Sequence, residues 1–200
     1  NQLMLKDVTY RIEQAQIGVI VCTAEGEISD IVEQACRACP QVHARVLARG
    51  RRDGWLCLED AMAQAAPFAR PVGKADPQND DTMFIYFSSG TAGMPKMVAH
   101  DYTYPLGHIP TAVYWQNVQK DKLHLTIAET GWLKALWGKL YGQWMGEAAV
   151  FVFDFDRFHP DAVLSAISRH HVATLCAPPT IYRFLIKQDL TQYDLSSLQY

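Results

Sequence analysis

Hydrophobic and polar positions along the chain form two alternating patterns. Residues 17–22 and residues 83–87 are continuous apolar runs, rich in β-branched or aromatic side chains, which predict strands buried on both faces. Between such runs, apolar residues recur every three or four positions, as from Glu27 to Cys39, and Pro40 ends this helical pattern. A further strand around residues 46–47 completes a β-α-β unit, which predicts parallel pairing.

The same alternation continues to the end of the chain. Asp7 is expected to cap the first helix and to pair with Arg11. The loop from Pro67 to Asp81 is rich in proline and aspartate and is expected to lie on the surface between strands of one sheet. The sequence therefore predicts an α/β fold, a largely parallel sheet flanked by helices on both faces. Further strands are predicted at residues 97–100, 123–127, 148–153 and 172–176, and further helices at 58–66, 132–144, from 160 and from 178.

The strand predicted at residues 83–87 leads into a loop whose side chains suit a polyphosphate. Glycines let main-chain N–H groups approach a large anion, hydroxyls donate hydrogen bonds to its oxygens, and a lysine adds a compact positive charge. Pro95 prevents a helix just before that lysine. We call residues 88–96 the phosphate loop, and its members are Ser88, Ser89, Gly90, Thr91, Ala92, Gly93, Met94, Pro95 and Lys96.

The spacing of this loop differs from that of two common nucleotide-binding loops. A Walker-type loop has a glycine, four residues and then Gly-Lys before a helix, whereas Lys96 lies three residues after Gly93 and precedes a predicted strand. The glycine fingerprint of dinucleotide-binding folds is also absent from the sequence. On residue types alone, a glycine-rich hairpin turn without a ligand stays open as the alternative, because turns collect Gly, Ser and Pro.

Composition narrows the classes of function. The chain has 200 residues, 49% of them hydrophobic, and a net charge of −3, so it can form a sizeable core. No run reaches the ~18 apolar residues of a membrane span, and the first residues lack the layout of a secretion signal, so we expect a soluble protein without a membrane span. Basic residues are scattered except for Arg49, Arg51 and Arg52, which we expect in an exposed turn, so we expect no nucleic-acid partner.

The cysteines and histidines are interpreted as structural. Five cysteines, an odd number, argue against a disulfide framework, and we therefore expect a cytoplasmic setting. Cys36 and Cys39 form a C-x-x-C without a second pair, inside a helical pattern, so small buried thiols are expected and no metal site. The seven histidines, including His100 and His124, are expected to have structural roles.

Residues 86–96 resemble the Ser/Thr/Gly-rich signature loop of the adenylate-forming enzymes, a group that includes acyl-coenzyme A synthetases, luciferases and peptide-synthetase adenylation domains. Within this group the chain is most similar to the medium-chain acyl-coenzyme A synthetases, and the resemblance covers nearly all 200 residues. The loop departs from the family at Ala92, where Thr or Ser is common, which removes one phosphate donor. The supporting segments are Asp-Val-Thr-Tyr-Arg at 7–11, Asp-Gly-Trp-Leu at 53–56, Glu-Thr-Gly-Trp at 129–132 and Ala-Pro-Pro-Thr-Ile-Tyr-Arg at 177–183.

This resemblance implies a reaction and its cofactors. In the parent reaction, a fatty-acid carboxylate attacks the α-phosphorus of Mg-ATP to give acyl-adenylate and pyrophosphate, and the thiol of coenzyme A then displaces AMP. ATP, Mg²⁺ and coenzyme A are therefore the implied cofactors, and a small-molecule carboxylate is the implied partner; the oligomeric state is not indicated. Counterparts of the family's later elements and of its C-terminal domain are missing, so residues 1–200 are expected to be part of the large N-terminal domain and to be inactive alone.

The resemblance also assigns roles to residues. The phosphate loop would bind ATP, with Lys96 and Thr91 as its catalytic members, and no protein metal ligand is implied. Gln2 falls where related synthetases touch coenzyme A, and Gly131 and Trp132 correspond to the lining of the acyl pocket.

Two alternatives stay open beside this interpretation. The first is an adenylation module for amino or aryl acids, which would need a polar anchor in the pocket where this chain has Trp132. The second is a non-catalytic α/β domain that binds a nucleotide.

Overall fold

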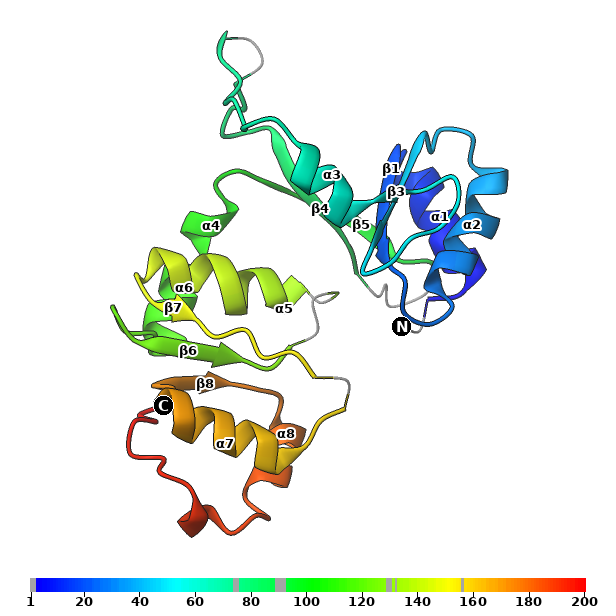
Figure 1. The fold of residues 1–200 in the computed structure, drawn as a ribbon. Helices are drawn as coiled ribbons and strands as arrows, with labels where there is room; N and C mark the ends of the chain where they lie inside the picture. Colours follow the sequence, from blue (N-terminus) through cyan, green and yellow to red (C-terminus); the bar gives the residue numbers. More distant parts are fainter. Residues whose placement is uncertain (1–2, 74–75, 89–92, 129–130, 132, 156) are drawn as a thin grey trace. The chain divides into compact units, whose positions relative to one another are not determined.

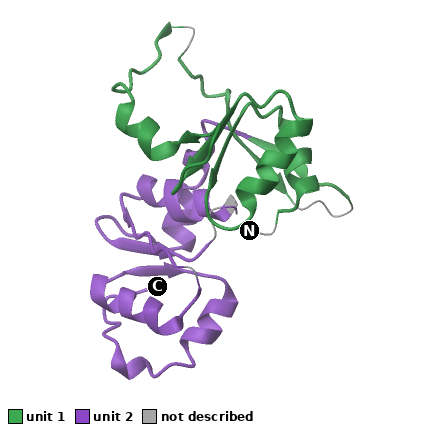
Figure 2. Cartoon of the chain, turned by 45° about the vertical axis from the view of Figure 1, so that its right-hand side comes forward, with its two compact units in different colours: residues 1–99 green, residues 100–200 purple. Residues whose placement is uncertain are grey.

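The computed structural model describes residues 3–73, 76–88, 93–128, 131, 133–155 and 157–200, and the chain divides into two compact units. Unit 1 is Asn1–Ala99 and unit 2 is His100–Tyr200, drawn in two colours in Figure 2. The predicted parallel pairing occurs in both units. The described strands form three sheets, so the single sheet expected on both sides of the 67–81 loop is not observed among them.

In unit 1, the first helix is followed by the predicted β-α-β unit (Figure 1). Its three-stranded sheet has the order β1-β2-β3, and all pairs are parallel. The strands and helices of unit 1 are α1 (Leu5–Ala15), β1 (Val19–Thr23), α2 (Ile28–Ala38), β2 (Ala44–Ala48), β3 (Leu56–Cys57), α3 (Leu58–Gln64), β4 (Thr82–Ser88) and β5 (Lys96–Asp101), the last of which runs into unit 2.

The core of unit 1 lies between α1, α2 and one face of this sheet. Val8 and Ile12 of α1 and Val32 of α2 are buried, and Ile20 and Cys22 of β1 pack against them. The opposite face of β1 is different from our prediction, because Val19 and Val21 are 48% and 59% exposed. Successive strand residues point to opposite faces, so helices on one side bury only every second residue of this apolar run.

The first helix begins differently from the prediction. Met4, not Asp7, is the N-cap residue of α1, and the Asp7 carboxylate accepts a hydrogen bond from the Met4 N–H at 3.0 Å. Arg11 Nη1 donates to the Asp7 carbonyl oxygen at 2.9 Å, so the expected pairing of Arg11 with the Asp7 side chain is replaced by a bond to its backbone.

β4 and β5 form a two-stranded sheet of their own. The strand predicted at 83–87 is confirmed as β4, but its expected burial on both faces is wrong: none of its residues is buried, and Ile85 is 40% exposed. A two-stranded sheet has no neighbouring strand on either side, which leaves its apolar side chains only partly covered.

Unit 2 holds a second parallel sheet, with the order β7-β6-β8 (Figure 1). The strand predicted at residues 148–153 shortens to β7, and Val152 beyond it is 71% exposed, so that prediction of a buried strand was wrong. The elements of unit 2 are α4 (Tyr104–Gly107), η2 (Thr111–Trp115), β6 (Leu123–Thr126), α5 (Leu133–Leu136), η3 (Trp137–Tyr141), α6 (Gly142–Met145), β7 (Ala149–Val150), α7 (Pro160–His170), β8 (Thr174–Cys176), α8 (Pro179–Leu185) and η4 (Leu190–Gln192).

One face of this sheet is apolar. Leu125 of β6 and Leu175 of β8 pack with Val163 and Ile167 of α7 and with Leu185 at the end of α8. The last two residues run beside β8, because the Gln199 N–H donates to the Ala173 oxygen and the Leu175 N–H donates to the Tyr200 oxygen, both at 2.8 Å.

The other face of the sheet carries a buried polar network, a term we use for His124, Thr126, Thr174 and the Gly138 carbonyl. His124 Nδ1 lies 2.6 Å from Thr174 Oγ1, and Nε2 lies 2.8 Å from Thr126 Oγ1. The Thr126 hydroxyl donates its proton to the Gly138 carbonyl oxygen, so the Thr126 oxygen can only accept from the His124 ring. His124 therefore carries its proton on Nε2, and its Nδ1 accepts the hydrogen bond from the Thr174 hydroxyl. Burial lowers the pKa of His124 to about 4, which keeps the imidazole neutral.

The helix predicted over residues 132–144 is interrupted. Its middle turn, η3, is a π-helix between α5 and α6. The Gly138 carbonyl accepts hydrogen bonds from Gln116 Nε2 and Gln143 Nε2, each at 3.0 Å, besides the bond from Thr126. A π turn lacks the regular i→i−4 backbone hydrogen bonds of an α-helix, and at this turn the Gly138 carbonyl accepts from side chains. Periodicity alone did not predict it.

Within the part of the chain that is described, no helix combines the length and the apolar character needed to cross a bilayer.

Candidate functional site

The phosphate loop is described at its two ends. Ser88 is the last residue of β4, and Lys96 is the first residue of β5. Gly93, Met94 and Pro95 lead into β5, whereas Ser89, Gly90, Thr91 and Ala92 lie outside the described residues. The strand-loop-strand arrangement predicted around the loop is therefore confirmed on both sides of it.

The ends of the loop lie side by side. β4 and β5 are hydrogen-bonded neighbours, and Ser88 Oγ lies 3.5 Å from the Lys96 carbonyl oxygen, at the outer limit of a hydrogen bond. Ser88 and Lys96 are both exposed, and among the described residues no ion pair involves Lys96. Ser88 and Lys96 are thus brought to the same end of the strand pair, and both residues are exposed to solvent.

Gly93 has a backbone conformation that side chains rarely adopt. Its φ is +116°, and among the described residues no heavy atom lies within 4 Å of the position that a Cβ would take. The glycine is therefore required by its backbone conformation and not by crowding. Met94, the next residue, is 50% exposed. The described end of the loop is open to a ligand.

One turn of α1 contacts both ends of the phosphate loop. The Tyr10 hydroxyl donates to the Pro95 carbonyl oxygen at 2.9 Å, and the Tyr10 ring packs edge-on against Phe87 with centroids 6.2 Å apart. The Arg11 guanidinium lies 5.3 Å from the centre of the same Phe87 ring. Sequence reasoning missed this role: the sequence predicted a helix cap at Asp7, a pairing with Arg11 and a segment shared with a family, but no contact with the phosphate loop.

The predicted acyl-pocket residues are described only in part. Gly131 is an exposed turn residue beyond β6, and Trp132 lies outside the described residues. Nearby in the sequence, Trp137 stacks on His108 with centroids 5.5 Å apart and packs against Trp115 at 5.8 Å. Sequence reasoning did not identify this aromatic cluster, because its members lie on η3, on η2 and directly after α4.

Gln2, the predicted contact for coenzyme A, also lies outside the described residues.

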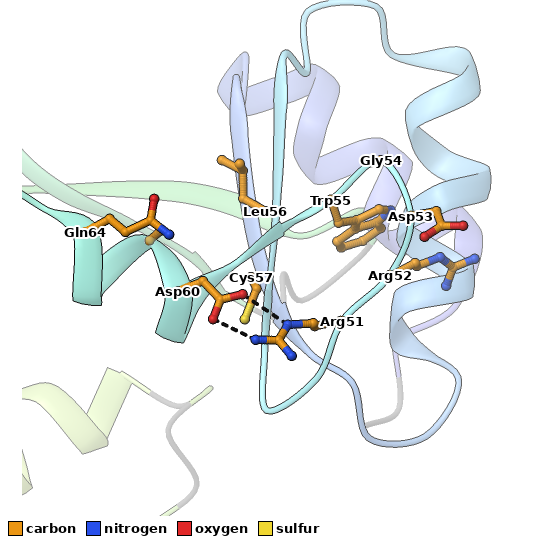
Figure 3. Close-up of a pocket in the computed structure, with 10 residues that line it drawn as sticks. Arg51, Arg52, Asp53, Gly54, Trp55, Leu56, Cys57, Asp60 and Gln64 are labelled. Carbon is orange, nitrogen blue, oxygen red and sulfur yellow. Dashed lines mark hydrogen bonds and ion pairs between the residues drawn. The ribbon is translucent and has the colours of Figure 1, made fainter.

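A cavity of about 690 Å³ opens in unit 1, lined by residues 51–57 and by α3 (Figure 3). Arg51 forms two hydrogen bonds with the Asp60 carboxylate, at 3.0 and 2.7 Å, and these bonds lower the pKa of Asp60. Arg52 Nη1 lies 2.7 Å from Asp30 Oδ1. The arginines expected in an exposed turn are therefore paired with carboxylates, and this cavity offers a bound anion no uncommitted charge from Arg51 or Arg52.

Trp55 lies at the centre of a second charged group in unit 1. Its Nε1–H donates to Glu33 at 2.8 Å, and the guanidiniums of Arg45 and Arg52 each lie 5.6 Å from its ring. Arg45 Nη1 lies 2.9 Å from both carboxylate oxygens of Glu33. The hydrogen bond from Trp55 is the main reason that the pKa of Glu33 is lowered. This group joins α2, β2 and the segment before β3.

All five cysteines are free thiols, with Cys39 and Cys176 buried. Burial raises the pKa of the Cys36 and Cys39 thiols. Among the described residues, no group of three His, Cys, Asp or Glu side chains is arranged to hold a metal ion.

Curated relatives match the whole chain. It is 32% identical over 201 residues to acyl-coenzyme A synthetase ACSM4, mitochondrial, of Rattus norvegicus, and 28% identical over 202 residues to acyl-coenzyme A synthetase ACSM3, mitochondrial, of Homo sapiens. Each match covers 100% of this chain and 34% of the relative, so the chain spans about a third of the length of these proteins.

These relatives correct the expected cytoplasmic localisation. Their names place them in the mitochondrion, which contradicts that expectation. The cysteine pattern failed as a guide because it separates disulfide-forming compartments from reducing ones and does not distinguish between reducing compartments.

Solved structures have the same fold. The structure of the anthranilate-coenzyme A ligase AuaEII in complex with anthranoyl-AMP has a TM-score of 0.85 and 23% identity, over 99% of this chain and 38% of that one. A luciferase-like enzyme from the mealworm Zophobas morio has a TM-score of 0.78 and 18% identity, over 99% of this chain and 45% of that one. The predicted α/β class with parallel sheets and flanking helices is confirmed.

The family model described as AMP-binding enzyme matches residues 2–200. Since this match extends over nearly the entire chain and agrees with the fold and with the phosphate-loop motif, the chain belongs to the AMP-binding enzyme family.

Proposed function

We propose that the protein carrying this chain is an AMP-forming acyl-coenzyme A synthetase, which activates a medium-chain fatty acid with ATP and transfers the acyl group to coenzyme A. One observation carries the proposal: Ser88 and Lys96, exposed and adjacent at the ends of the phosphate loop, present a hydroxyl and an ammonium without an ion-pair partner among the described residues. The family match over residues 2–200 supports the same conclusion.

In this proposal, the phosphate loop stabilises charge on the β- and γ-phosphates. The bond from the α-phosphorus to the bridging oxygen breaks as the carboxylate attacks, and pyrophosphate leaves with the additional negative charge. That charge is stabilised by the Lys96 ammonium, by the hydroxyls of Ser88 and Thr91 and by the loop N–H groups. This stabilisation lowers the activation barrier most when the donors are already oriented before the reaction. Lys96 and Thr91 are the proposed catalytic members.

The donors of the loop fit a polyphosphate, since the ammonium, the hydroxyls and the N–H groups all donate hydrogen bonds to anionic oxygens. Mg²⁺ is proposed to enter bound to the phosphates of ATP. The chemical basis is that Mg²⁺ commonly keeps several of its waters and binds through substrate phosphates.

We further propose that Gln2 contacts coenzyme A and that Gly131 and Trp132 line the acyl pocket. Residues 1–200 would then form part of the large N-terminal domain of the synthetase. The exposure of Gly131 is compatible with a substrate tail lying against it.

An aryl acid is the second candidate substrate. His108 and Trp137 stack with an interplanar angle of 18°, and His108 Nδ1 lies 3.0 Å from Thr111 Oγ1. Planar aromatic side chains of this kind suit an aryl ring, and the structure of the anthranilate-coenzyme A ligase has the same fold as this chain.

The test is pyrophosphate release by the complete protein with ATP and carboxylates of graded chain length, with benzoate included. The Lys96→Ala variant is expected to lose about 10²-fold or more in kcat/KM for ATP. The substitution removes the interaction between the lysine charge and the leaving pyrophosphate, which is stronger in the transition state than in the ground state. Lys187→Ala, at another exposed lysine, is the matched control. Equal rates for the Lys96→Ala and Lys187→Ala proteins would refute the proposal, and a preference for benzoate would favour the aryl acid.

A further inference from the structure

The N-terminal helix holds the phosphate loop at both of its ends. Phe87 precedes the loop and contacts the Tyr10 ring and the Arg11 guanidinium, while Pro95 accepts the Tyr10 hydroxyl bond next to Lys96. Tyr10 and Pro95 are 85 residues apart in sequence, yet both belong to unit 1. Two adjacent residues on one helical turn thus contact both sides of the loop.

We propose that Tyr10 and Arg11 are positioning residues that orient Lys96 for the phosphates of ATP. This inference rests on the proposed function, because it assigns to α1 the task of holding the lysine that the proposal places on the leaving pyrophosphate.

The peptide group between Pro95 and Lys96 links the Tyr10 hydrogen bond to the orientation of Lys96. No cis bond occurs among the described residues, so this group is trans and planar, and its carbonyl and its N–H point in opposite directions. The Tyr10 hydroxyl bond fixes the direction of the Pro95 carbonyl at 2.9 Å. It therefore also fixes the direction of the Lys96 N–H and the starting point of the lysine side chain.

The described end of the loop has few contacts of its own. Among the described residues, no heavy atom lies within 4 Å of the position that a Cβ would take at Gly93, and Met94 is half exposed. Proline restricts its own φ but leaves the rotation after it free, so the carbonyl of Pro95 needs an external partner to stay in one orientation. Tyr10 provides that partner, and its T-shaped contact with Phe87, at an interplanar angle of 68°, holds the phenol in place.

Arg11 supports the other side of the same contact. Its guanidinium lies over the Phe87 ring while Nη1 donates to the Asp7 carbonyl oxygen at 2.9 Å, which restrains the arginine along its own helix. Phe87 is therefore held between an aromatic edge and a cation, both from α1.

The Tyr10 hydroxyl is not needed for docking α1 in unit 1. The helix is anchored by Val8 and Ile12, which are 8% and 1% exposed. Each helical residue advances by about 100°, so Tyr10 is separated from each of these residues by about 160° around the helix axis and lies on the far side of the helix. The Tyr10→Phe variant keeps the ring and its contact with Phe87 and loses only the bond to Pro95.

The test compares two tyrosines in the complete protein. The Tyr182 hydroxyl donates to the Leu175 carbonyl oxygen at 2.8 Å, so Tyr182→Phe removes an equivalent bond in unit 2. Both variants are expected to lower the melting temperature slightly. Only Tyr10→Phe is expected to lower kcat/KM for ATP, by about tenfold, with the KM for the carboxylate unchanged, because a small displacement of a catalytic group is costly for rate.

A double-mutant cycle separates this inference from the proposed function. If Tyr10 acts through Lys96, then Tyr10→Phe lowers kcat/KM for ATP by about tenfold in the wild-type protein and by less than about twofold in the Lys96→Ala background. A large loss for Lys96→Ala with no effect of Tyr10→Phe on kcat or KM would overturn the inference alone. No loss for Lys96→Ala would overturn the proposed function.

Arg11 supplies an independent variant. Arg11→Met keeps an unbranched side chain over Phe87 but removes the cation, and we expect a fall in kcat/KM for ATP that Arg11→Lys partly restores. Equal activities for Arg11→Met and wild type would contradict the role of Arg11.

Discussion

The two parallel sheets of this chain differ in what they bury. In unit 1, one face of β1-β2-β3 packs on α1 and α2 through apolar side chains, and Val19 and Val21 on the other face are about half exposed. In unit 2, β7-β6-β8 packs on α7 and α8 through an apolar core and buries His124, Thr126 and Thr174 on its second face.

This difference distinguishes polar groups that stabilise the fold from polar groups that are accessible to a ligand. His124 is a residue type often used as a general base, but both ring nitrogens are engaged and its pKa is lowered to about 4. Its contacts agree with the structural role expected for it. Ser88 and Lys96 in unit 1 are exposed. In this chain, the polar groups with committed partners maintain the fold, and the exposed groups at the phosphate loop are the ones able to meet a ligand.

The largest expected effect is the loss of the buried polar network. We expect His124→Ala to lower the free energy of unfolding by about 4 kcal/mol, because it leaves a cavity and removes the buried partners of Thr126 and Thr174. Val21→Ala, on the exposed face of β1, is the control and should cost less than about 1 kcal/mol. Denaturant unfolding measures both, and similar costs would remove the distinction between the two sheets.

The pH dependence of stability sharpens the same comparison. The folded-state pKa of His124 is about 4, below its ordinary value of 6.5, so the unfolded chain binds more protons between these pH values. Its contribution is therefore complete above about pH 6.5 and is lost as the pH falls towards 4, by about 3 kcal/mol in total. Unfolding curves at several pH values should show this slope in wild type, and an unchanged slope in His124→Phe would contradict it.

A smaller effect is expected at the charged group of unit 1. Glu33→Gln keeps the shape of the side chain but removes the charge that Arg45 and Trp55 meet, and we expect a loss of about 1.5 kcal/mol. The lowered pKa of Glu33 implies that this stabilisation is lost as the pH falls through that pKa. Thermal unfolding checks the magnitude, and a stabilised Glu33→Gln protein would show that the charge is unfavourable there.

The smallest effect is expected at the cavity of Figure 3. Arg51 and Asp60 are paired, but their side chains are 76% and 47% exposed. We expect Arg51→Gln to leave the melting temperature and the KM for ATP unchanged, because exposed ion pairs are screened by water and salt. A raised KM for ATP would show that this cavity, and not the phosphate loop alone, takes part in nucleotide binding.

Much of the fold was predictable from local pattern. The helix predicted from Glu27 to Cys39 was found as α2, and the strands on both sides of the phosphate loop were found as β4 and β5. These predictions succeeded because hydrophobic periodicity and proline act over a few residues. The exposure of Ile85 was not predictable, since a pattern of apolar residues does not reveal how many neighbours a strand obtains.

The sequence by itself determined the α/β alternation, the donors of the phosphate loop and the likeness to a family. Only the tertiary structure decided that Tyr10 reaches Pro95, that Thr126 meets the Gly138 carbonyl, and that His124 is locked as a neutral imidazole. The physical reason is that residue type and spacing specify local backbone geometry and which groups can donate or accept. The identity of each partner depends on packing between segments far apart in the chain, here as many as 85 residues.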